Sequence, residues 1–595
     1  MEKQTKLNVY LFQPQYAVEI RKENTYWLPY SAGCIWSYAS TIPEISEKYV
    51  LAELGFKRED PTDIIQRMNL RTPSVCGFSC YVWNEQYCLA LAKKVKQNFP
   101  NCRIIFGGAQ ASAKLTEYDF IDSVILAEGE ESFADFLLSD VNQKIYDKQR
   151  MSNLDIPSPY TTGLFDKLLE DNPTALWSMT FETNRGCPYA CTFCDWGGTT
   201  YSKVRKFNID RITADLEWAI GKPVSYVFCA DANFGIFKER DLEIAKILKR
   251  VADQCAIETI NLQYAKNSTE LVFEIAQILG EYSRGVTVSV QSMHDATLTA
   301  IKRRNMDVNK VSNLISLSKK YGVGTYTEVI LGLPEETLES WCDGLCEILE
   351  LGQHDSIDMW FAQLLENSEL NQIESKKKYS IDSVTGADYF ALYNSADYKD
   401  IQETIELIRS TSTMSSSELA EAYMFGWMII HWHINGYSQH IAKSVRKSGI
   451  TYKQYYDKLL TMIKDCPLFG AHYLELKDLV YKYLSNGKLE IQSNKSHGHN
   501  LHTHSYDFMY EKRKLAYNLA IQCGEQFVSL EQTDKFIQNH FLFDKYIDYP
   551  LQYNETIIKT KLKDNKNIDF YSLRRKGLLK NTISQGDIKC NISTH

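Results

Sequence analysis

The sequence predicts an α/β protein in three parts. We expect a doubly wound domain over residues 1–150, a partial (β/α)6 barrel over residues 175–370 and a mostly helical C-terminal domain over residues 371–595. Three observations predict this. Strand-like runs alternate with helical patterns before residue 140, and helical periodicity dominates from about residue 370. Between them, six more strand–helix units follow at roughly even spacing, with strands expected at 175–181, 225–229, 258–263, 286–290, 325–331 and 356–363. The stretch 151–174 contains prolines and glycine and is expected to be a linker.

Length and composition narrow the class of protein. A chain of 595 residues is too long for one core, and contents of 44% hydrophobic and 24% charged residues are those of an ordinary globular protein. The formal net charge of −9 argues against broad nucleic-acid or anionic-membrane binding. No signal-peptide pattern opens the chain, and its most apolar later stretch, 423–434, is too short for a bilayer. Fifteen scattered cysteines then favour a reducing, cytoplasmic location.

The first part of the chain has the pattern of a parallel sheet. Strands are expected at 7–12, 74–79, 103–106 and 122–126, with an amphipathic helix at 87–97. Ligands of such sheets bind beyond the carboxyl ends of the strands. Two turns there are candidates. One is Gly107–Gly108, whose missing side chains let a bulky group approach the backbone.

The other candidate turn is Glu128-Gly129-Glu130, which follows the last strand and begins a helix. Its position at a strand end makes it a suitable place for polar contacts. Ordinary turns without a ligand are the alternative for both stretches.

Cys187, Cys191 and Cys194 form a C-x3-C-x2-C motif directly after the strand-like run 175–181. Thiolates suit iron–sulfur chemistry. Because a four-iron cluster normally takes four protein thiolates, three would leave one iron open for a substrate or cofactor. A structural zinc site wants four ligands, and no neighbouring cysteine or histidine completes such a set. Three unrelated core cysteines are the other alternative.

These cysteines, with aromatic Phe193 before the third, resemble the signature of radical S-adenosylmethionine (SAM) enzymes. The resemblance implies a [4Fe-4S] cluster held by the three cysteines, with SAM chelated on the open iron. It also implies an electron donor such as flavodoxin or ferredoxin, and cleavage of SAM to methionine and a 5′-deoxyadenosyl radical. The family's fold is a partial barrel of six units, whose active site lies where strands end in loops.

In that family, residues at successive strand ends bind SAM, and this chain has polar residues in the same order. Asp231 and Asn233 end the second strand, where a carboxylate accepts bonds from the SAM ammonium group. Lys266 ends the third strand and is placed to pair with the SAM carboxylate. Further along, Ser289 and Gln291 end the fourth strand and suit ribose hydroxyls, and Arg303 supports the carboxylate side.

The first part of the chain resembles the cobalamin-binding domain of cobalamin-dependent radical SAM enzymes. Gly107–Gly108 and Glu128-Gly129-Glu130 correspond to stretches of those domains, with Ala127 replacing a glycine. No histidine precedes His294, so cobalt cannot receive a lower ligand from an N-terminal histidine. Trp83, after the central strand, resembles a tryptophan that packs beneath the corrin in the carbapenem-type methylases. The resemblance therefore assigns Trp83 to the lower cobalt face, with a core tryptophan as the alternative.

The resemblance implies a methyltransferase that moves a methyl group from methylcobalamin to a substrate carbon radical, which the deoxyadenosyl radical generates. A rearrangement or ring contraction is the first alternative. A methylthiotransferase would carry further cluster cysteines in its N-terminal domain, and the cysteines there lie in mostly apolar contexts. A non-catalytic binding module is a third alternative. The substrate, a small molecule or a peptide, stays open, as does the role of the histidine-rich stretch 497–504.

Overall fold

The computed structural model divides into two compact units, and each is described by itself. The first contains Met1–Ala265, Gln363–Lys376 and Thr385–Glu406, and the second contains Lys266–Ala362, Lys377–Val384 and Leu407–His595. This division does not test the expected boundaries near residues 150, 174 and 370, which stay predictions. The residues that the structure describes are 5–15, 24–141, 143–148, 151, 153–196, 202–265, 269–304, 308–388, 397–489, 505, 508–509 and 511–529.

The first unit opens with a six-stranded sheet in the order β3-β1-β4-β5-β6-β7, and its strand pairings are parallel. The first five strands therefore have the 2-1-3-4-5 order of flavodoxin-like folds, in which the topology switches between β1 and β4. That switch point is where such sheets bind ligands. The strands are β1 (Leu7–Phe12), β3 (Tyr49–Gly55), β4 (Pro73–Ser79), β5 (Arg103–Gly107), β6 (Ser123–Ile125) and β7 (Ile145–Tyr146).

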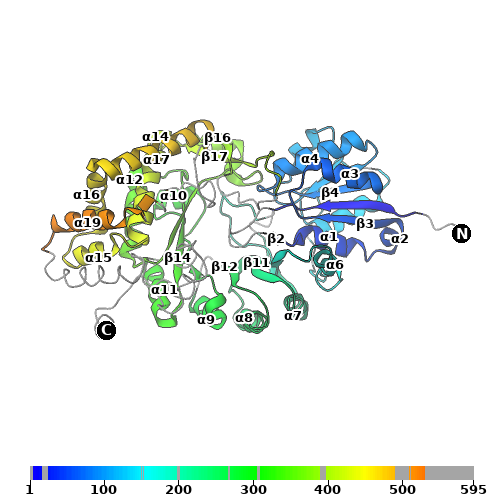
Figure 1. Ribbon diagram of the computed structural model, residues 1–595, viewed down its shortest axis with the longest axis horizontal. Helices are drawn as coiled ribbons and strands as arrows, with labels where there is room; N and C mark the ends of the chain where they lie inside the picture. Colours follow the sequence, from blue (N-terminus) through cyan, green and yellow to red (C-terminus); the bar gives the residue numbers. More distant parts are fainter. Residues whose placement is uncertain are drawn as a thin grey trace. The chain divides into compact units, whose positions relative to one another are not determined.

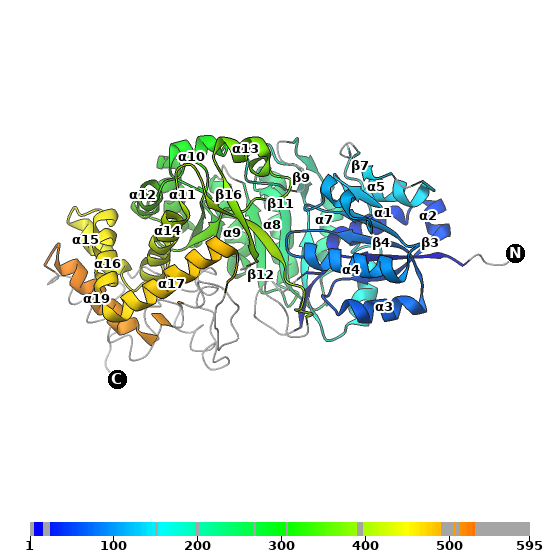
Figure 2. The same ribbon diagram turned by 90° about the horizontal axis from the view of Figure 1, so that it is seen from above.

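Helices cover both faces of this sheet, which confirms the doubly wound prediction. Figures 1 and 2 show α3 and α4 on one face and α1 and α2 on the other; α5 packs against α1. Apolar side chains fill the layers between: the rings of Phe12, Phe78 and Phe106 stack across neighbouring strands at centroid distances of 5.4 and 4.9 Å. The helices are α1 (Tyr30–Ala39), α2 (Pro43–Lys48), α3 (Pro61–Leu70), α4 (Glu85–Asn98) and α5 (Gly129–Leu138), with a 3-10 turn η1 (Ala113–Glu117).

The first unit also holds the first half of the predicted barrel. Its sheet has the order β12-β11-β8-β2, again with parallel pairings. The short strand β2, which the sequence pattern missed, joins this sheet beside β8 rather than the N-terminal one. The elements are β2 (Thr25–Trp27), α6 (Leu164–Asp171), β8 (Leu176–Phe181), α7 (Ile209–Glu217), β11 (Val224–Phe234), α8 (Lys238–Ala252) and β12 (Thr259–Tyr264).

The second unit holds the other three predicted barrel strands, in a parallel sheet of order β13-β14-β15. All six expected strand positions are therefore strands. The elements are α9 (Glu270–Leu279), η2 (Gly280–Tyr282), β13 (Val286–Thr287), α10 (Asp295–Ala300), α11 (Val308–Tyr321), β14 (Thr325–Leu331), α12 (Leu338–Glu350) and β15 (Ile357–Phe361).

The described residues after 370 are mostly helical, as predicted, and include a two-stranded sheet of β16 and β17. Capping boxes at Ser415 and Thr451 begin α14 and α16, and α17 packs against both of these helices (Figure 2). The stretch 497–504 lies outside the described residues. The elements are η3 (Glu369–Asn371), α13 (Ile373–Lys378), β16 (Asp382–Ala387), β17 (Thr404–Ser410), α14 (Ser416–Met428), the π-helical turn η4 (Ile429–Ile434), α15 (Gln439–Lys447), α16 (Tyr452–Asp465), α17 (Pro467–Asn486) and α19 (Arg513–Glu525).

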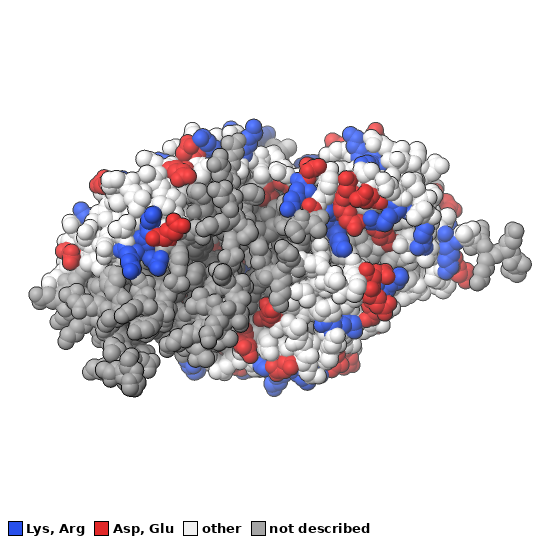
Figure 3. All heavy atoms as spheres, in the orientation of Figure 1, with Lys and Arg blue, Asp and Glu red and all other residues white. Residues whose placement is uncertain are grey.

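The described surface carries charges of both signs. Figure 3 shows Lys and Arg interspersed with Asp and Glu over the described part of one face. Across the ranges given above, no helix is long and apolar enough to cross a membrane.

Candidate functional site

The three cysteines lie in a loop closed by a short two-stranded stem. Strand β9 (Asn184–Arg185) pairs antiparallel with β10 (Arg205–Lys206), so the chain from 186 to 204 leaves and returns at one point. The Ser202 N–H donates to the Cys187 carbonyl at 2.6 Å, and the Cys187 N–H donates to Ser202 Oγ at 3.3 Å. Cys187 and Cys191 are buried, whereas Cys194 and Phe193 are partly exposed. The stem thus closes the loop that carries the three cysteines, and two of these cysteines are shielded from water.

Asn233, at the end of β11, contacts the first cysteine. Its Nδ2 donates to Cys187 Sγ at 3.3 Å, and its side chain is 1% exposed. Its Oδ1 is buried with no hydrogen-bond partner among the described residues. A buried amide that gives its N–H to a cysteine sulfur and keeps an unused acceptor fits a thiolate with a further polar group bound beside it. The predicted SAM contact of Asn233 stays a prediction.

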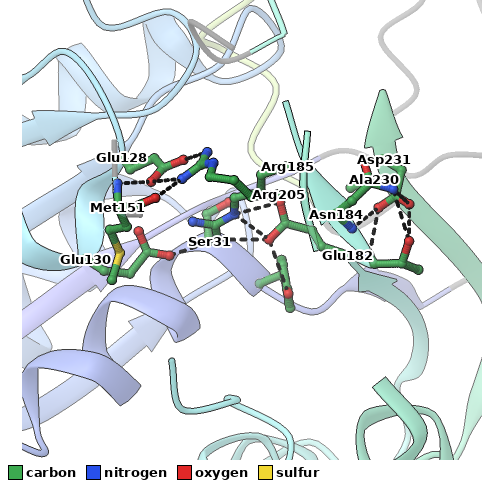
Figure 4. A network of polar contacts seen from close by, with 12 residues as sticks. Ser31, Glu128, Glu130, Met151, Glu182, Asn184, Arg185, Arg205, Ala230 and Asp231 are labelled. Carbon is green, nitrogen blue, oxygen red and sulfur yellow. Dashed lines mark hydrogen bonds and ion pairs between the residues drawn. The ribbon is translucent and has the colours of Figure 1, made fainter. Parts of the chain in front are cut away.

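Asp231 lies two residues earlier on β11 and is fully buried. It accepts bonds from the Thr183 and Asn184 N–H groups at 2.7 and 3.1 Å, from Asn184 Nδ2 at 2.7 Å, and from the Thr183 hydroxyl. Burial raises the pKa of Asp231 to about 7, and these donors oppose that rise. The carboxylate therefore fastens the β8–β9 connection to β11 (Figure 4). Its contact with the SAM ammonium group also stays a prediction.

In the second unit, three predicted SAM residues form one hydrogen-bonded group. The Ser289 hydroxyl donates to Gln291 Oε1 at 3.0 Å, and Arg303 Nη2 donates to the Ser289 carbonyl. Gln291 has φ 62°, a left-handed conformation unusual for a residue with a side chain, and its backbone bonds Glu328 and Ile330 of β14. Such strain is concentrated at functional sites. Lys266 lies outside the described residues.

The loop after β4 lies at the switch point of the N-terminal sheet, and hydrogen bonds of the Asn84 side chain fix its conformation. Asn84 Nδ2 donates to the carbonyls of Pro14 and Ser79, and Asn84 Oδ1 accepts from the Tyr81 N–H at 2.7 Å. The Trp83 ring stacks on Tyr81 with centroids 4.5 Å apart, and its indole N–H is buried with no partner among the described residues. This rigid aromatic loop fits a large planar ligand, so the corrin assignment of Trp83 stays a prediction that its position supports.

Packing inside the N-terminal domain explains the Gly107–Gly108 pair without any ligand. Gly108 has φ +101°, and a Cβ there would lie 2.5 Å from the Cys80 carbonyl oxygen. The Cys80 N–H in turn donates to the Gly107 carbonyl at 2.6 Å. The pair thus lets β5 pack against the loop that carries Trp83, and its direct contact with cobalamin stays a prediction.

Glu128 and Glu130 are paired with two arginines that the sequence pattern did not reveal. Glu128 binds Arg205 and Glu130 binds Arg185, one on each strand of the cysteine-loop stem. No local sequence pattern marks these pairs, because the partners lie 55 and 77 residues apart in the chain. The predicted contacts of Glu128, Gly129 and Glu130 with cobalamin stay predictions.

Comparisons with known proteins identify the family. The radical SAM superfamily matches residues 181–343. The chain is 31% identical over 503 residues to the cobalamin-dependent radical SAM methyltransferase TokK of Streptomyces tokunonensis, a match that covers 78% of this chain and 72% of TokK. The chain belongs to the cobalamin-dependent radical SAM methyltransferases. Another relative, the 2-(S-pantetheinyl)-carbapenam-3-carboxylate methyltransferase of Streptantibioticus cattleyicolor, is 30% identical with the same coverage.

Solved structures show the same fold. The radical SAM methyltransferase TsrM of Kitasatospora setae, with tryptophan and a SAM analogue bound, matches 72% of this chain and 91% of its own length. The cobalamin-dependent radical enzyme OxsB matches 98% of this chain and 82% of its own length. Both have a TM-score of 0.51 at 13% sequence identity.

Membership of this family confirms the predicted class of enzyme and its cofactors: a [4Fe-4S] cluster, SAM and cobalamin. It also means that the enzyme acts on a substrate and needs a reductant. Among the residues that the structure describes, no three His, Cys, Asp or Glu side chains converge to hold a single metal ion. A cluster does not need such convergence, because each thiolate binds a different iron.

Proposed function

We propose that this enzyme methylates a carbon atom of a small molecule, with the cluster on Cys187, Cys191 and Cys194. The observation that carries the proposal is the Asn233–Cys187 hydrogen bond, because it aims a neutral donor at a cysteine sulfur and leaves a buried acceptor beside it. When bound, the cluster and SAM supply a radical that removes a substrate hydrogen atom, and cobalamin delivers a methyl group that a second SAM provides. The protein holds these groups and keeps water away.

Each part of the chain has a proposed task. Asn233 Oδ1 accepts from the SAM ammonium group, and Asp231 keeps the β8–β9 connection in place for it. In the second unit, Ser289, Gln291 and Arg303 contact the ribose and carboxylate of SAM. Trp83 would hold the corrin against an apolar surface and, because an indole ring does not ligate cobalt, would supply no donor to the metal from this loop.

The proposed substrate class follows from the relatives. One of them methylates, by its name, a carbapenam carboxylate that carries a pantetheinyl thioether. We propose a small carboxylate of that kind for this enzyme, and flavodoxin or ferredoxin as the electron donor. A cytoplasmic location would suit an oxygen-sensitive cluster and fifteen scattered cysteines.

The test is anaerobic reconstitution with iron, sulfide and hydroxocobalamin, followed by turnover with methyl-labelled SAM, 2-(S-pantetheinyl)-carbapenam-3-carboxylate and reduced flavodoxin as the electron donor. We expect deoxyadenosine and a product that carries the label on carbon. Deoxyadenosine with a changed but unlabelled product would replace methylation by a rearrangement. The Cys191→Ala variant is the control and should form neither product.

A further inference from the structure

The stem of the cysteine loop places two positive charges next to each other. Arg185 and Arg205 are direct partners in the β9–β10 register, so two guanidinium groups leave neighbouring positions of one short hairpin. Like charges opposite each other destabilise a strand pair. A two-residue pairing has little to offset this, so the stem depends on the acceptors that the two arginines bind.

The turn between β6 and α5 supplies those acceptors. Arg205 binds both carboxylate oxygens of Glu128, one of them at 3.0 Å, and Arg185 Nη2 donates to Glu130 Oε1 at 2.8 Å. Glu128 also accepts from the Met151 N–H at 3.0 Å. The four side chains are 4–13% exposed, so both ion pairs are largely shielded from water. Figure 4 shows the two glutamates facing the two arginines.

The turn is built to present these two carboxylates. Gly129 separates them, and a Cβ there would lie 3.0 Å from Ile35 Cδ1 of α1, which keeps the turn close to that helix. Although burial acts to raise the pKa of the Glu130 carboxyl, the charge and hydrogen bond of Arg185 bring that pKa below its usual value. Glu182, just before the stem, binds Arg185 from the other side at 2.9 Å. Each arginine is thereby neutralised.

We propose that Glu128 and Glu130 form an acidic clasp, an ion-paired contact by which the N-terminal sheet holds the stem of the cysteine loop in position. The clasp makes both glutamates positioning residues for the cluster rather than ligands of cobalamin. Both carboxylate oxygens of Glu128 accept hydrogen bonds from Arg205, so this carboxylate binds the stem. The clasp acts on the loop before any reaction, so its role does not depend on which product the enzyme forms.

The test compares Glu128→Gln, Arg205→Gln, the double variant and the charge-swapped pair Glu128→Arg with Arg205→Glu. The first measurement is hydrogen exchange of peptides that cover 184–196, and the second is iron release from the reconstituted cluster to a chelator. We expect each single variant to speed both about tenfold or more, because removing one partner leaves the other charge shielded and unpaired. The double variant should be no worse than the worse single one, and the swapped pair should recover most of the loss.

Two further measurements separate a clasp from other roles. Titration with hydroxocobalamin should give similar affinities for wild type and Arg205→Gln, and the change that SAM causes in the EPR spectrum of the reduced cluster should be lost in the single variants and restored by the swap. The matched control is Arg250→Gln, whose exposed pair with Glu217 joins two neighbouring helices and should alter nothing. Weaker cobalamin binding by Glu128→Gln with normal exchange and iron release would overturn the proposal, as would failure of the swap. If Glu128→Gln does not fold, the swap and Glu130→Gln decide.

Discussion

The Asn233 amide donates its N–H to the sulfur of Cys187, which we propose as a cluster ligand, and this has an electrochemical consequence. Reduction adds negative charge to an iron–sulfur cluster, and hydrogen bonds to its sulfurs stabilise that charge. At 1% exposure, water cannot replace the Asn233 donor without rearrangement. This residue is therefore expected to set how easily the cluster accepts the electron that starts catalysis.

Asn233→Leu should shift the midpoint potential of the cluster to a more negative value, since the reduced state loses its donor. The measurement is a redox titration followed by EPR of the reduced cluster. Asn261→Leu is the control, because Asn261 is also buried, on the neighbouring strand β12, but donates to the Tyr226 hydroxyl. Equal potentials in wild type and Asn233→Leu would contradict the assignment.

Distance along the sequence explains which site residues could be predicted. The three cysteines are within eight residues of one another, so their spacing alone carries the meaning. Asp231 was recognised as a strand-end carboxylate, but its partners Thr183 and Asn184 lie 48 and 47 residues earlier, and no local pattern joins them. Arg185 and Arg205 were missed for the same reason.

At the scale of elements, strand positions were more predictable than strand ends. β14 spans 325–331 as expected. β11 was expected to end at Cys229 but continues to Phe234, because Phe234 pairs with Tyr264 of β12 after a register shift. The added stretch carries Asp231 and Asn233, whose polar side chains do not look like a buried strand. β13 is shorter than expected, and the left-handed Gln291 follows it.

The contact between β5 and the loop after β4 makes Gly108 a sensitive position. Gly163 offers a matched comparison, because its φ of +76° is also left-handed but a Cβ there would meet nothing within 4 Å. Gly163→Ala should cost roughly 1–2 kcal/mol of unfolding free energy from backbone strain alone. Gly108→Ala adds a clash with the Cys80 backbone and should cost about 3 kcal/mol or more.

Urea unfolding at equal protein concentration measures both costs in stability. Titration with hydroxocobalamin measures cobalamin affinity, which reports on the position of the Trp83 loop. We expect Gly108→Ala to weaken cobalamin binding, since the clash displaces the loop that carries Trp83, and Gly163→Ala to leave it unchanged. Equal costs for the two variants would mean that the Cys80 contact yields without strain.

At the scale of the whole molecule, the first unit is assembled from three separated stretches of chain. A fully buried ion pair joins two of them: Arg58 Nη1 donates to Glu403 Oε1 at 2.6 Å, and both side chains are 0% exposed. Arg58 also donates to the Ile401 carbonyl at 2.6 Å. No sequence pattern predicts this contact, because its partners are 345 residues apart.

Glu403 has a second task in the same place. Its carboxylate accepts from the N–H groups of Gln86 and Tyr87 at 2.8 and 3.1 Å, at the start of α4. Free N–H groups and the helix dipole make that end a favourable position for negative charge. Although burial raises the pKa of Glu403, Arg58 and these two donors oppose it. The segment 385–406 thus supplies the acceptor for the first N–H groups of α4, the helix that follows the Trp83 loop.

Arg58→Met should therefore destabilise the first unit by about 3–5 kcal/mol, because it leaves a buried carboxylate without its charge partner. Glu403→Gln should cost a similar amount, and the double variant should cost clearly less than the sum, since neither charge is then left alone. Urea unfolding monitored by tryptophan fluorescence measures the three variants. Arg250→Met, which breaks an exposed pair in the same unit, should cost less than about 1 kcal/mol. Additive costs for the two buried substitutions would contradict this. They would show that other contacts, rather than this ion pair, hold the segment 385–406 in the first unit.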